Sequence, residues 1–163
     1  MHIEGPNVSA RAECEAVLRS VPQWFGIEAA LLMYAADTTT KPTFLLRDGT
    51  RAVGFMTLAQ HFPHAWEMHC VAVHAQARNR GHGSALLAHA EAWLVAQGAR
   101  LFQVKTVAAR NRPPEPYAET RAFYDKRGFM PLEVFPLLWD AHNPCLQMIK
   151  LLPAARPVFE SAP

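Results

Sequence analysis

The chain has few of the features that mark disulfide-rich or membrane-spanning proteins. It has only three cysteines, Cys14, Cys70 and Cys145, which lie far apart and in no paired spacing, so neither a disulfide framework nor a zinc ribbon is expected. No apolar run reaches the roughly 18 residues of a membrane span. The first residues lack the basic region and apolar stretch of a secretory signal. We therefore expect a cytoplasmic protein with no membrane partner.

An excess of charge of one sign is also missing. The formal net charge is +2, and no run of basic residues concentrates it, so a nucleic-acid partner is not expected. With 163 residues, 50% hydrophobic and 18% charged, the chain can bury the core of one domain. We predict a single domain over residues 1–152 and a loose tail over residues 153–163. Whether the protein is a monomer or a homodimer stays open.

Hydrophobic periodicity and turn residues predict an α/β chain in which strands and helices alternate. Predicted helices cover residues 9–20, with Ser9 as the N-cap, and residues 26–36, 84–97 and 118–127. Gly98 and Gly128 follow the last two of these helices, as left-handed C-terminal caps would. Predicted strands lie near residues 2–4 and over 43–47, 51–61, 66–74, 101–107, 129–139 and 143–152. The prolines of residues 108–117 exclude both helix and strand, so this stretch is predicted to be a loop.

The stretch between the strand at 66–74 and the helix at 84–97 has the composition of an anion-binding loop. It reads Arg78-Asn79-Arg80-Gly81-His82-Gly83-Ser84. In a strand–turn–helix arrangement several backbone N–H groups converge, and the helix dipole adds to their attraction for an anion. The two glycines allow close approach of the ligand, and the two arginines add charge-assisted contacts. We therefore predict a phosphate-binding loop.

Two common phosphate-binding patterns do not fit this loop. A Walker loop would end in Gly-Lys-Ser or Gly-Lys-Thr, and a dinucleotide-binding loop would have a third glycine where Leu86 stands. The pattern that fits is Arg-x-x-Gly-x-Gly, and here the chain resembles the GNAT superfamily of acyl-CoA-dependent N-acetyltransferases. A second motif, residues 120–129, is similar to the family's Ala-x-x-Phe-Tyr-x-x-x-Gly-Phe. The resemblance extends over residues 43–152.

The resemblance implies a fold, a cofactor and a set of binding residues. The fold would be a mixed, mostly antiparallel sheet with helices on both faces. The loop would bind the pyrophosphate of acetyl-CoA, the strand before it would run beside the pantetheine, and the backbone N–H of Val71 or a neighbour would polarise the thioester carbonyl. The residues assigned to the cofactor are Val71, Ala72, Val73, Arg78, Asn79, Arg80, Gly81, His82, Gly83 and Ser84.

The resemblance also suggests two catalytic residues, Tyr124 and Glu67. In the family the tyrosine of the Phe-Tyr pair lies near the cofactor sulfur, and its ordinary pKa of about 10 keeps it protonated, as a general acid must be. Lysine acetyltransferases of the family place a glutamate base where Glu67 stands; a solvated carboxylate at the end of a strand is an equal alternative. Strand alternation would put Glu67, His69 and Val71 on one face, so His69 is a rival base, although a strand histidine is more often structural.

Other residues have weaker functional interpretations. The scatter of His61, His64 and His74 over turns argues against a metal site, so no metal is expected. Cys70, inside an apolar strand, is predicted to be a core residue rather than a nucleophile. The aromatic side chains that could line the acceptor pocket, or simply belong to the core, are Trp24, Phe25 and Tyr34. The family's cofactor-binding asparagine has only a doubtful counterpart, Asn111 in the proline-rich stretch.

The predicted function is acetyl transfer from acetyl-CoA to a primary amine by direct attack in a ternary complex. The acceptor cannot be read from the sequence; a small molecule is favoured over a protein, with residues 108–117 as a lid. The arginines that could serve an anionic acceptor, or simply be solvated, are Arg110, Arg112 and Arg121. Two alternatives stay open: a non-catalytic acyl-CoA-binding module, and a toxin or ribosome-associated acetyltransferase that modifies RNA-bound or protein amines.

Overall fold

A computed structural model describes residues 1–6, 9–110 and 115–154 of the chain. Its seven-stranded sheet has the order β1-β2-β3-β4-β5-β7-β6, and only β4 and β5 pair in parallel. The strands are β1 (His2–Glu4), β2 (Thr43–Asp48), β3 (Arg51–Phe62), β4 (Ala65–Val73), β5 (Leu101–Val107), β6 (Met130–Asp140) and β7 (Asn143–Leu151). The helices are α1 (Arg11–Arg19), α2 (Glu28–Asp37), α3 (His82–Ala96) and α4 (Ala118–Lys126), with a short 3₁₀ helix η1 at Ala75–Ala77.

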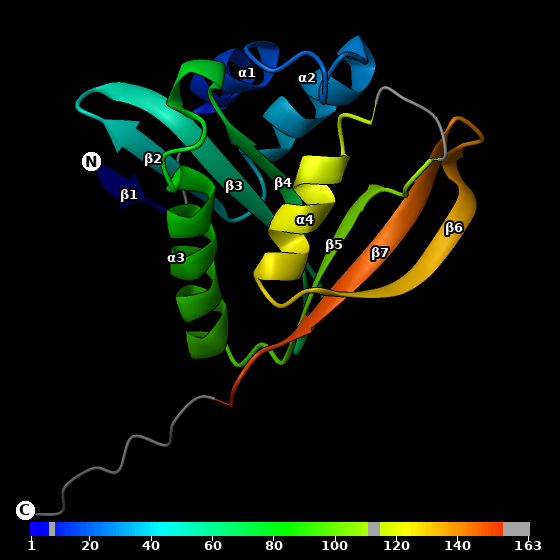
Figure 1. Cartoon of the computed structure of the whole chain (residues 1–163). Coiled ribbons are helices and arrows are strands. Elements are labelled where there is room, and N and C mark those ends of the chain that lie inside the picture. The colour runs from blue at the N-terminus through cyan, green and yellow to red at the C-terminus, as the bar shows by residue number, and fades with distance from the viewer. Residues whose placement is uncertain (7–8, 111–114, 155–163) are drawn as a thin grey trace, which may run out of the picture.

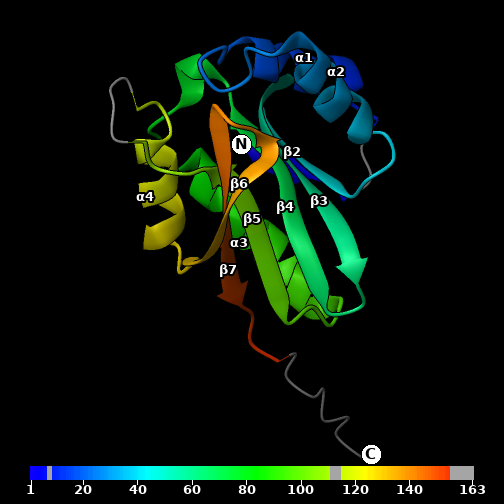
Figure 2. The same cartoon turned by 90° about the vertical axis from the view of Figure 1, so that its right-hand side faces the viewer.

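Two hydrophobic cores, one on each face of the sheet, join the helices to the strands (Figures 1 and 2). Helices α1 and α2 cover one face, where Val17, Leu18 and Leu31 pack on Leu45 and Phe55. The other face is covered by α3 and by α4, and the side chains from these helices and the sheet that form its core include Leu86, Leu87, Leu94, Tyr124, Phe44, Met56 and Phe102. The predicted mixed sheet with helices on both faces is therefore confirmed.

The starts of three helices differ from the sequence prediction, and one of them is α2, which begins at Glu28 rather than at residue 26. Ser9 is not the cap of α1, because the helix begins at Arg11 and the N-cap position is Ala10, which makes no side-chain capping bond. Helix α3 begins at His82 rather than at residue 84, because the left-handed residue Gly81, with φ of 82°, already occupies its N-cap. Gly98 and Gly128 do follow α3 and α4 in the left-handed conformation, with φ of 78° and 84°.

Strands β4 and β5 separate halfway along their length. Their parallel ladder pairs residues 65–68 with residues 101–104 and ends at Met68 and Val104. Beyond this pair β4 stays with β3, while β5 stays with β7 as far as Val107 and Cys145. The edge of β4 that faces β5 therefore carries backbone groups without a strand partner from His69 to Val73.

Parts of three sequence predictions lie outside the described residues. These parts are residues 7–8, residues 111–114 of the proline-rich stretch, which include Asn111 and Arg112, and residues 155–163 of the predicted tail. Strand β7 ends at Leu151, and the backbone N–H of Leu152 donates to the carbonyl of Arg100 at 2.9 Å. Among the helices within the described ranges, none is long and apolar enough to cross a membrane.

Candidate active site

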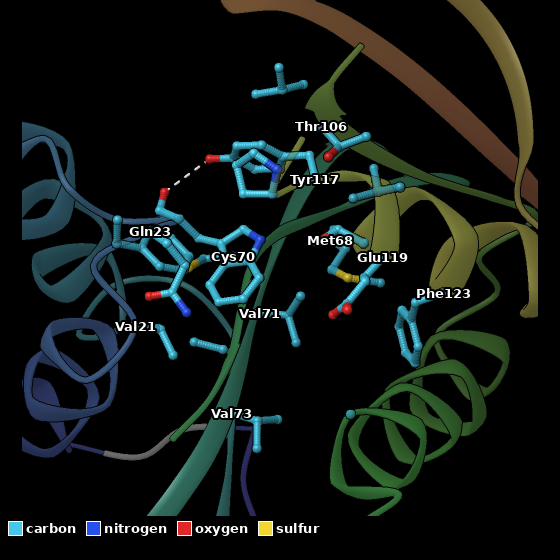
Figure 3. Close-up of a pocket in the computed structure, with 18 of the residues that line it drawn as sticks. Val21, Gln23, Met68, Cys70, Val71, Val73, Thr106, Tyr117, Glu119 and Phe123 are labelled. Atoms are coloured by element: carbon cyan, nitrogen blue, oxygen red, sulfur yellow. Dashed lines mark hydrogen bonds between the residues drawn. The ribbon is translucent and has the colours of Figure 1, made fainter. Parts of the chain in front are cut away.

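A cavity of about 1230 Å³ opens where β4 and β5 separate. Its walls come from the segment between α1 and α2, from α2, from β4 and β5, from the loop before α3, from α4 and from the β6–β7 turn. Figure 3 shows side chains from several of these elements converging on the same space. This volume exceeds the roughly 300–1,000 Å³ of a typical small-ligand pocket, so the cavity has room for a large ligand and a second, smaller one.

The predicted phosphate-binding loop forms one end of this cavity. Asn79 has a φ of 60° and Gly81 a φ of 82°, so the chain turns sharply into α3. The first bond of the helix runs from Ala85 N–H to the Gly81 carbonyl at 3.0 Å, and no side chain caps the helix. The N–H groups of residues 82–84 are therefore free to bind a ligand, as at other helix N-termini. All the residues predicted for the cofactor line the cavity except Arg80, which is exposed.

Two arginines add positive charge to this end of the cavity. The Arg78 guanidinium stacks 3.9 Å from the centre of the Trp24 ring and lies 3.7 Å from a carboxylate oxygen of Glu119. Arg127, at the end of α4, donates a hydrogen bond to the Ser84 hydroxyl. The sequence analysis placed Arg127 in the second motif without giving it a role, because its contact with Ser84 links positions that lie 43 residues apart.

A β-bulge in β4 reverses the direction of the side chains before the phosphate-binding loop. Cys70 pairs with Thr57 and Met68 with Leu58, so His69 has no partner on β3. Met68 and Val71 consequently pack with the α3 core, whereas Cys70 belongs to the α1–α2 core. In Figure 3, Val71 and Val73 extend toward Phe123 of α4, and Cys70 lies on the opposite side of β4. The expectation that Glu67, His69 and Val71 share one face is therefore wrong, because it assumed uninterrupted alternation.

Tyr124 lies in the wall of the cavity, on α4, with its ring packed between Phe123 and Phe129. The residue is only 5% exposed, and this burial raises the pKa of its phenol well above the ordinary value. Tyr124 therefore stays protonated at neutral pH, and its hydroxyl can donate a hydrogen bond or a proton to a developing anion.

Glu67 is buried in a polar cluster with His61, Gln103 and Lys105 and is not among the residues that line the cavity. Its Oε2 atom accepts from Lys105 Nζ at 2.6 Å, from His61 Nε2 at 2.6 Å and from Gln103 Nε2 at 2.9 Å. Burial favours a higher pKa, but these donors outweigh it, so the pKa of Glu67 is lowered. A carboxylate with a lowered pKa is a weak base, and the geometry does not favour the predicted role of Glu67.

His69, the unpaired residue of the bulge, does line the cavity. Its Nε2 atom lies 2.6 Å from Oδ2 of Asp37, the last residue of α2. The Tyr34 ring packs against the imidazole, with 5.3 Å between the ring centres. The sequence showed no sign of this pairing, because Asp37 and His69 lie 32 residues apart in different elements.

Aromatic side chains from the segment before α2, from α2, from the start of α4 and from β6 also line the cavity. Trp24, Phe25 and Tyr34 all line it, together with Tyr117 and Trp139. The Tyr117 hydroxyl donates to the Trp24 carbonyl at 3.0 Å, the dashed contact of Figure 3, and so ties the segment before α4 to the segment before α2. Within the described residues, no group of three or more histidine, cysteine or acidic side chains is arranged to hold a metal ion.

Comparison with protein families identifies the family of the chain. The model of the acetyltransferase (GNAT) family matches residues 14–129, which include β4, the phosphate-binding loop and the Phe123–Tyr124 pair. The chain belongs to the GNAT family. No curated protein matches the chain closely enough to count as a relative.

Solved structures with the GNAT fold cover nearly the whole chain. A GNAT-family acetyltransferase from Desulfovibrio desulfuricans has a TM-score of 0.79 at 17% identity, covering 93% of this chain and 99% of its own. An aminoglycoside 6'-N-acetyltransferase in complex with coenzyme A has a TM-score of 0.74 at 18% identity, covering 94% and 98%. The Escherichia coli ribosomal-protein-S18-alanine N-acetyltransferase has a TM-score of 0.76 at 15% identity, covering 96% and 97%. At these identities the likeness shows the fold alone.

Proposed function

We propose that this GNAT protein transfers an acetyl group from acetyl-CoA to a primary amine by direct attack in a ternary complex. The observation that carries the proposal is that three features line one cavity: the unpaired edge of β4, the uncapped N-terminus of α3 and the hydroxyl-bearing residue Tyr124. An acyl-CoA ligand has an extended amide-containing arm, a pyrophosphate and a thioester, and each feature suits one of these groups.

The residues of the cavity fit coenzyme A in charge and shape. The N–H groups of residues 82–84, with Arg78 and Arg127 nearby, would hold the pyrophosphate. The free edge of β4 over residues 70–73 would pair with the amides of the pantetheine arm, as an added strand does.

Acetyl transfer then needs few groups from the protein. The amine nitrogen attacks the thioester carbon, the new C–N bond forms, and the C–S bond breaks to release the thiolate. A backbone N–H on the β4 edge would stabilise the developing oxyanion, and Tyr124 would donate its proton to the departing sulfur. Burial of Tyr124 weakens it as an acid, so proton donation would accompany C–S cleavage rather than precede it.

The walls of the cavity favour a small, largely apolar amine over a polycation. Among the described lining residues the carboxylates are Glu119 and Asp140, and Glu119 already contacts Arg78. The cationic lining residues are Arg78, Lys105, Arg110 and Arg127. Arg78 and Arg127 would face the pyrophosphate, and Lys105 pairs with Glu67. A polyamine or an aminoglycoside would find only Asp140, among the described lining residues, as a carboxylate without an arginine or lysine partner, whereas an aromatic monoamine would pack against Tyr117.

A thiol-release assay tests the proposal. Free thiol is measured after acetyl-CoA is mixed with tyramine, spermidine, kanamycin or a peptide with an N-terminal alanine. We expect amine-dependent release that is fastest with tyramine. Tight acetyl-CoA binding with no release above the amine-free rate for any acceptor class would indicate a non-catalytic acyl-CoA-binding module instead. Fastest release with the peptide would identify a protein acceptor.

A further inference from the structure

The pair formed by His69 and Asp37 has the geometry of an oriented base. His69 Nε2 lies 2.6 Å from Asp37 Oδ2, and Lys41 Nζ lies 2.6 Å from the other carboxylate oxygen, Oδ1. Both members of the pair keep 20% of their side chains exposed, and His69, unlike Asp37, lines the cavity, so the imidazole is the member that a ligand in the cavity can reach. Because Met68 packs in the α3 core, His69 lies on the opposite face of β4, toward α2, and the bulge leaves it outside the ladder with β3.

The protonation of the pair follows from its contacts. Burial favours a higher pKa for Asp37, but hydrogen bonds from Lys41 and His69 outweigh it and lower the pKa, so Asp37 is ionised. An ionised carboxylate can only accept, so the hydrogen of neutral His69 is on Nε2 and a lone pair remains on Nδ1. The titratable groups next to the imidazole are Tyr34 of α2, with its ring centre 5.3 Å away, and the chain neighbour Cys70, while the ammonium of Lys105 lines the same cavity.

Burial keeps two of these neighbours neutral. It raises the pKa of Tyr34 to about 12 and the pKa of the Cys70 thiol well above its ordinary value, so neither carries charge at neutral pH. The charge of Lys105 is paired with Glu67, at 2.6 Å. Asp37 is therefore the charged group in direct contact with His69, and it stabilises the imidazolium form.

We propose that His69 is the base that accepts the proton of the acceptor amine, and that Asp37 is the positioning residue that fixes its tautomer and stabilises the imidazolium. This inference rests on the proposed acetyl transfer. As the amine nitrogen bonds to the acetyl carbon, its proton moves to His69 Nδ1. The departing thiolate takes a proton from Tyr124, His69 later releases its proton to solvent, and Tyr124 regains one from solvent, so that both groups are restored for the next turnover. Asp37 remains ionised throughout, as the carboxylate of a catalytic triad does.

The chain offers a matched control for this assignment. His61 and Glu67 form a second histidine–carboxylate pair with the same 2.6 Å separation, but neither residue lines the cavity. If a histidine–carboxylate pair mattered only for the stability of the sheet, changing either histidine would have a similar effect on turnover. If His69 is the base, only its replacement removes catalysis.

The first experiment compares His69→Gln with His61→Gln over a pH series with the best acceptor. We expect His69→Gln to lower kcat about 100-fold, the lower end of the range for general bases, and to leave the acetyl-CoA Kd unchanged. The acidic limb of the kcat/KM profile should disappear in this variant and persist in His61→Gln, whose kcat should stay within about twofold. Added imidazole should partly restore turnover in His69→Ala, which a misfolded variant would not allow. Equal rates in both glutamine variants would overturn the proposal.

The second experiment measures the tautomer of His69 directly, without an enzyme assay. Nitrogen-15 NMR of the imidazoles, with the His69 signals assigned by their loss in His69→Gln, should show neutral His69 with hydrogen on Nε2. Asp37→Asn should mix the two tautomers and lower kcat, because the amide no longer fixes the hydrogen on Nε2. An Nδ1–H tautomer in the wild type would overturn the proposal. Absence of acetyl transfer with the Nε2–H tautomer intact would instead overturn the proposed function.

Discussion

The two halves of the cavity are built in different ways. The proposed cofactor half comes mainly from one continuous stretch, residues 71–84, and offers the backbone of β4 and the start of α3. The proposed acceptor half is assembled from side chains of separate elements, among them Trp24, Tyr34, His69 and Tyr117. Backbone groups recognise what every acyl-CoA shares, whereas side chains decide which amine fits and which group takes its proton. Changes in the two halves should therefore affect different measurements, which the following variants test.

The largest effect should come from Gly81→Glu in the cofactor half. Gly81 has a φ of 82°, a backbone conformation that residues with a side chain rarely adopt. The glutamate would also place a carboxylate at the uncapped start of α3, where the pyrophosphate is expected. We expect acetyl-CoA binding, measured by calorimetry, to weaken by about 100-fold or more. Gly98→Glu is the matched control, since Gly98 has φ of 78°, is equally open and lies outside the cavity. Equal affinities in the two variants would place the pyrophosphate elsewhere.

Tyr124→Phe should separate chemistry from cofactor binding. The ring stays packed between Phe123 and Phe129, and only the hydroxyl is removed. We expect kcat to fall by about 100-fold, with the acetyl-CoA Kd within about threefold of the wild type. Tyr117→Phe, which loses the bond to the Trp24 carbonyl, should instead raise the KM of the acceptor. Unchanged turnover in Tyr124→Phe would remove the general-acid role.

Glu67→Gln should affect stability more than chemistry. The change leaves the Lys105 ammonium without its carboxylate partner, so we expect the free energy of unfolding to fall by about 1–2 kcal/mol at pH 7. Because the pKa of Glu67 is lowered in the folded state, its contribution is fully present above pH ~4.3 and is lost as the pH falls through the folded pKa.

Urea unfolding at a series of pH values checks this prediction. The difference between wild type and Glu67→Gln should shrink as the solution becomes more acidic. Glu91→Gln is the control, because Glu91 pairs only with the partly exposed Lys150. Its loss should lower the free energy of unfolding by less than about 1 kcal/mol. A loss of kcat in Glu67→Gln as large as in His69→Gln would return the role of base to Glu67.

The smallest effect should distinguish the two loop arginines. Arg78 lines the cavity and stacks its guanidinium on the Trp24 ring. Arg80 is exposed and is not among the residues that line the cavity. We expect Arg78→Ala to raise the acetyl-CoA Kd about tenfold and Arg80→Ala about twofold, because an exposed charge is screened by salt. Titrations at low and moderate ionic strength check this. An equal loss for both would show that Arg80 also reaches the ligand.

The elements and the loop could be predicted because their signals are local. Short stretches of sequence contain each of these signals: the glycines after α3 and α4, the alternation along β5 and the spacing of Gly81 and Gly83. Even so, the side-chain cap predicted at Ser9 is wrong, since α1 begins later, with Ala10 as its N-cap. Local signals therefore identified the family and its expected cofactor, but not the start of every helix.

The sequence alone determined the order of strands and helices, the glycine- and arginine-rich composition of residues 78–84 and the position of Tyr124 in a motif. Only the tertiary structure decided which side chains meet. The bulge at His69 arises from the register between β3 and β4, and it sends His69 to Asp37 and Val71 to the other face. The three donors on Glu67 come from two other strands. Such contacts depend on strand register and helix packing, which distant parts of the chain set together.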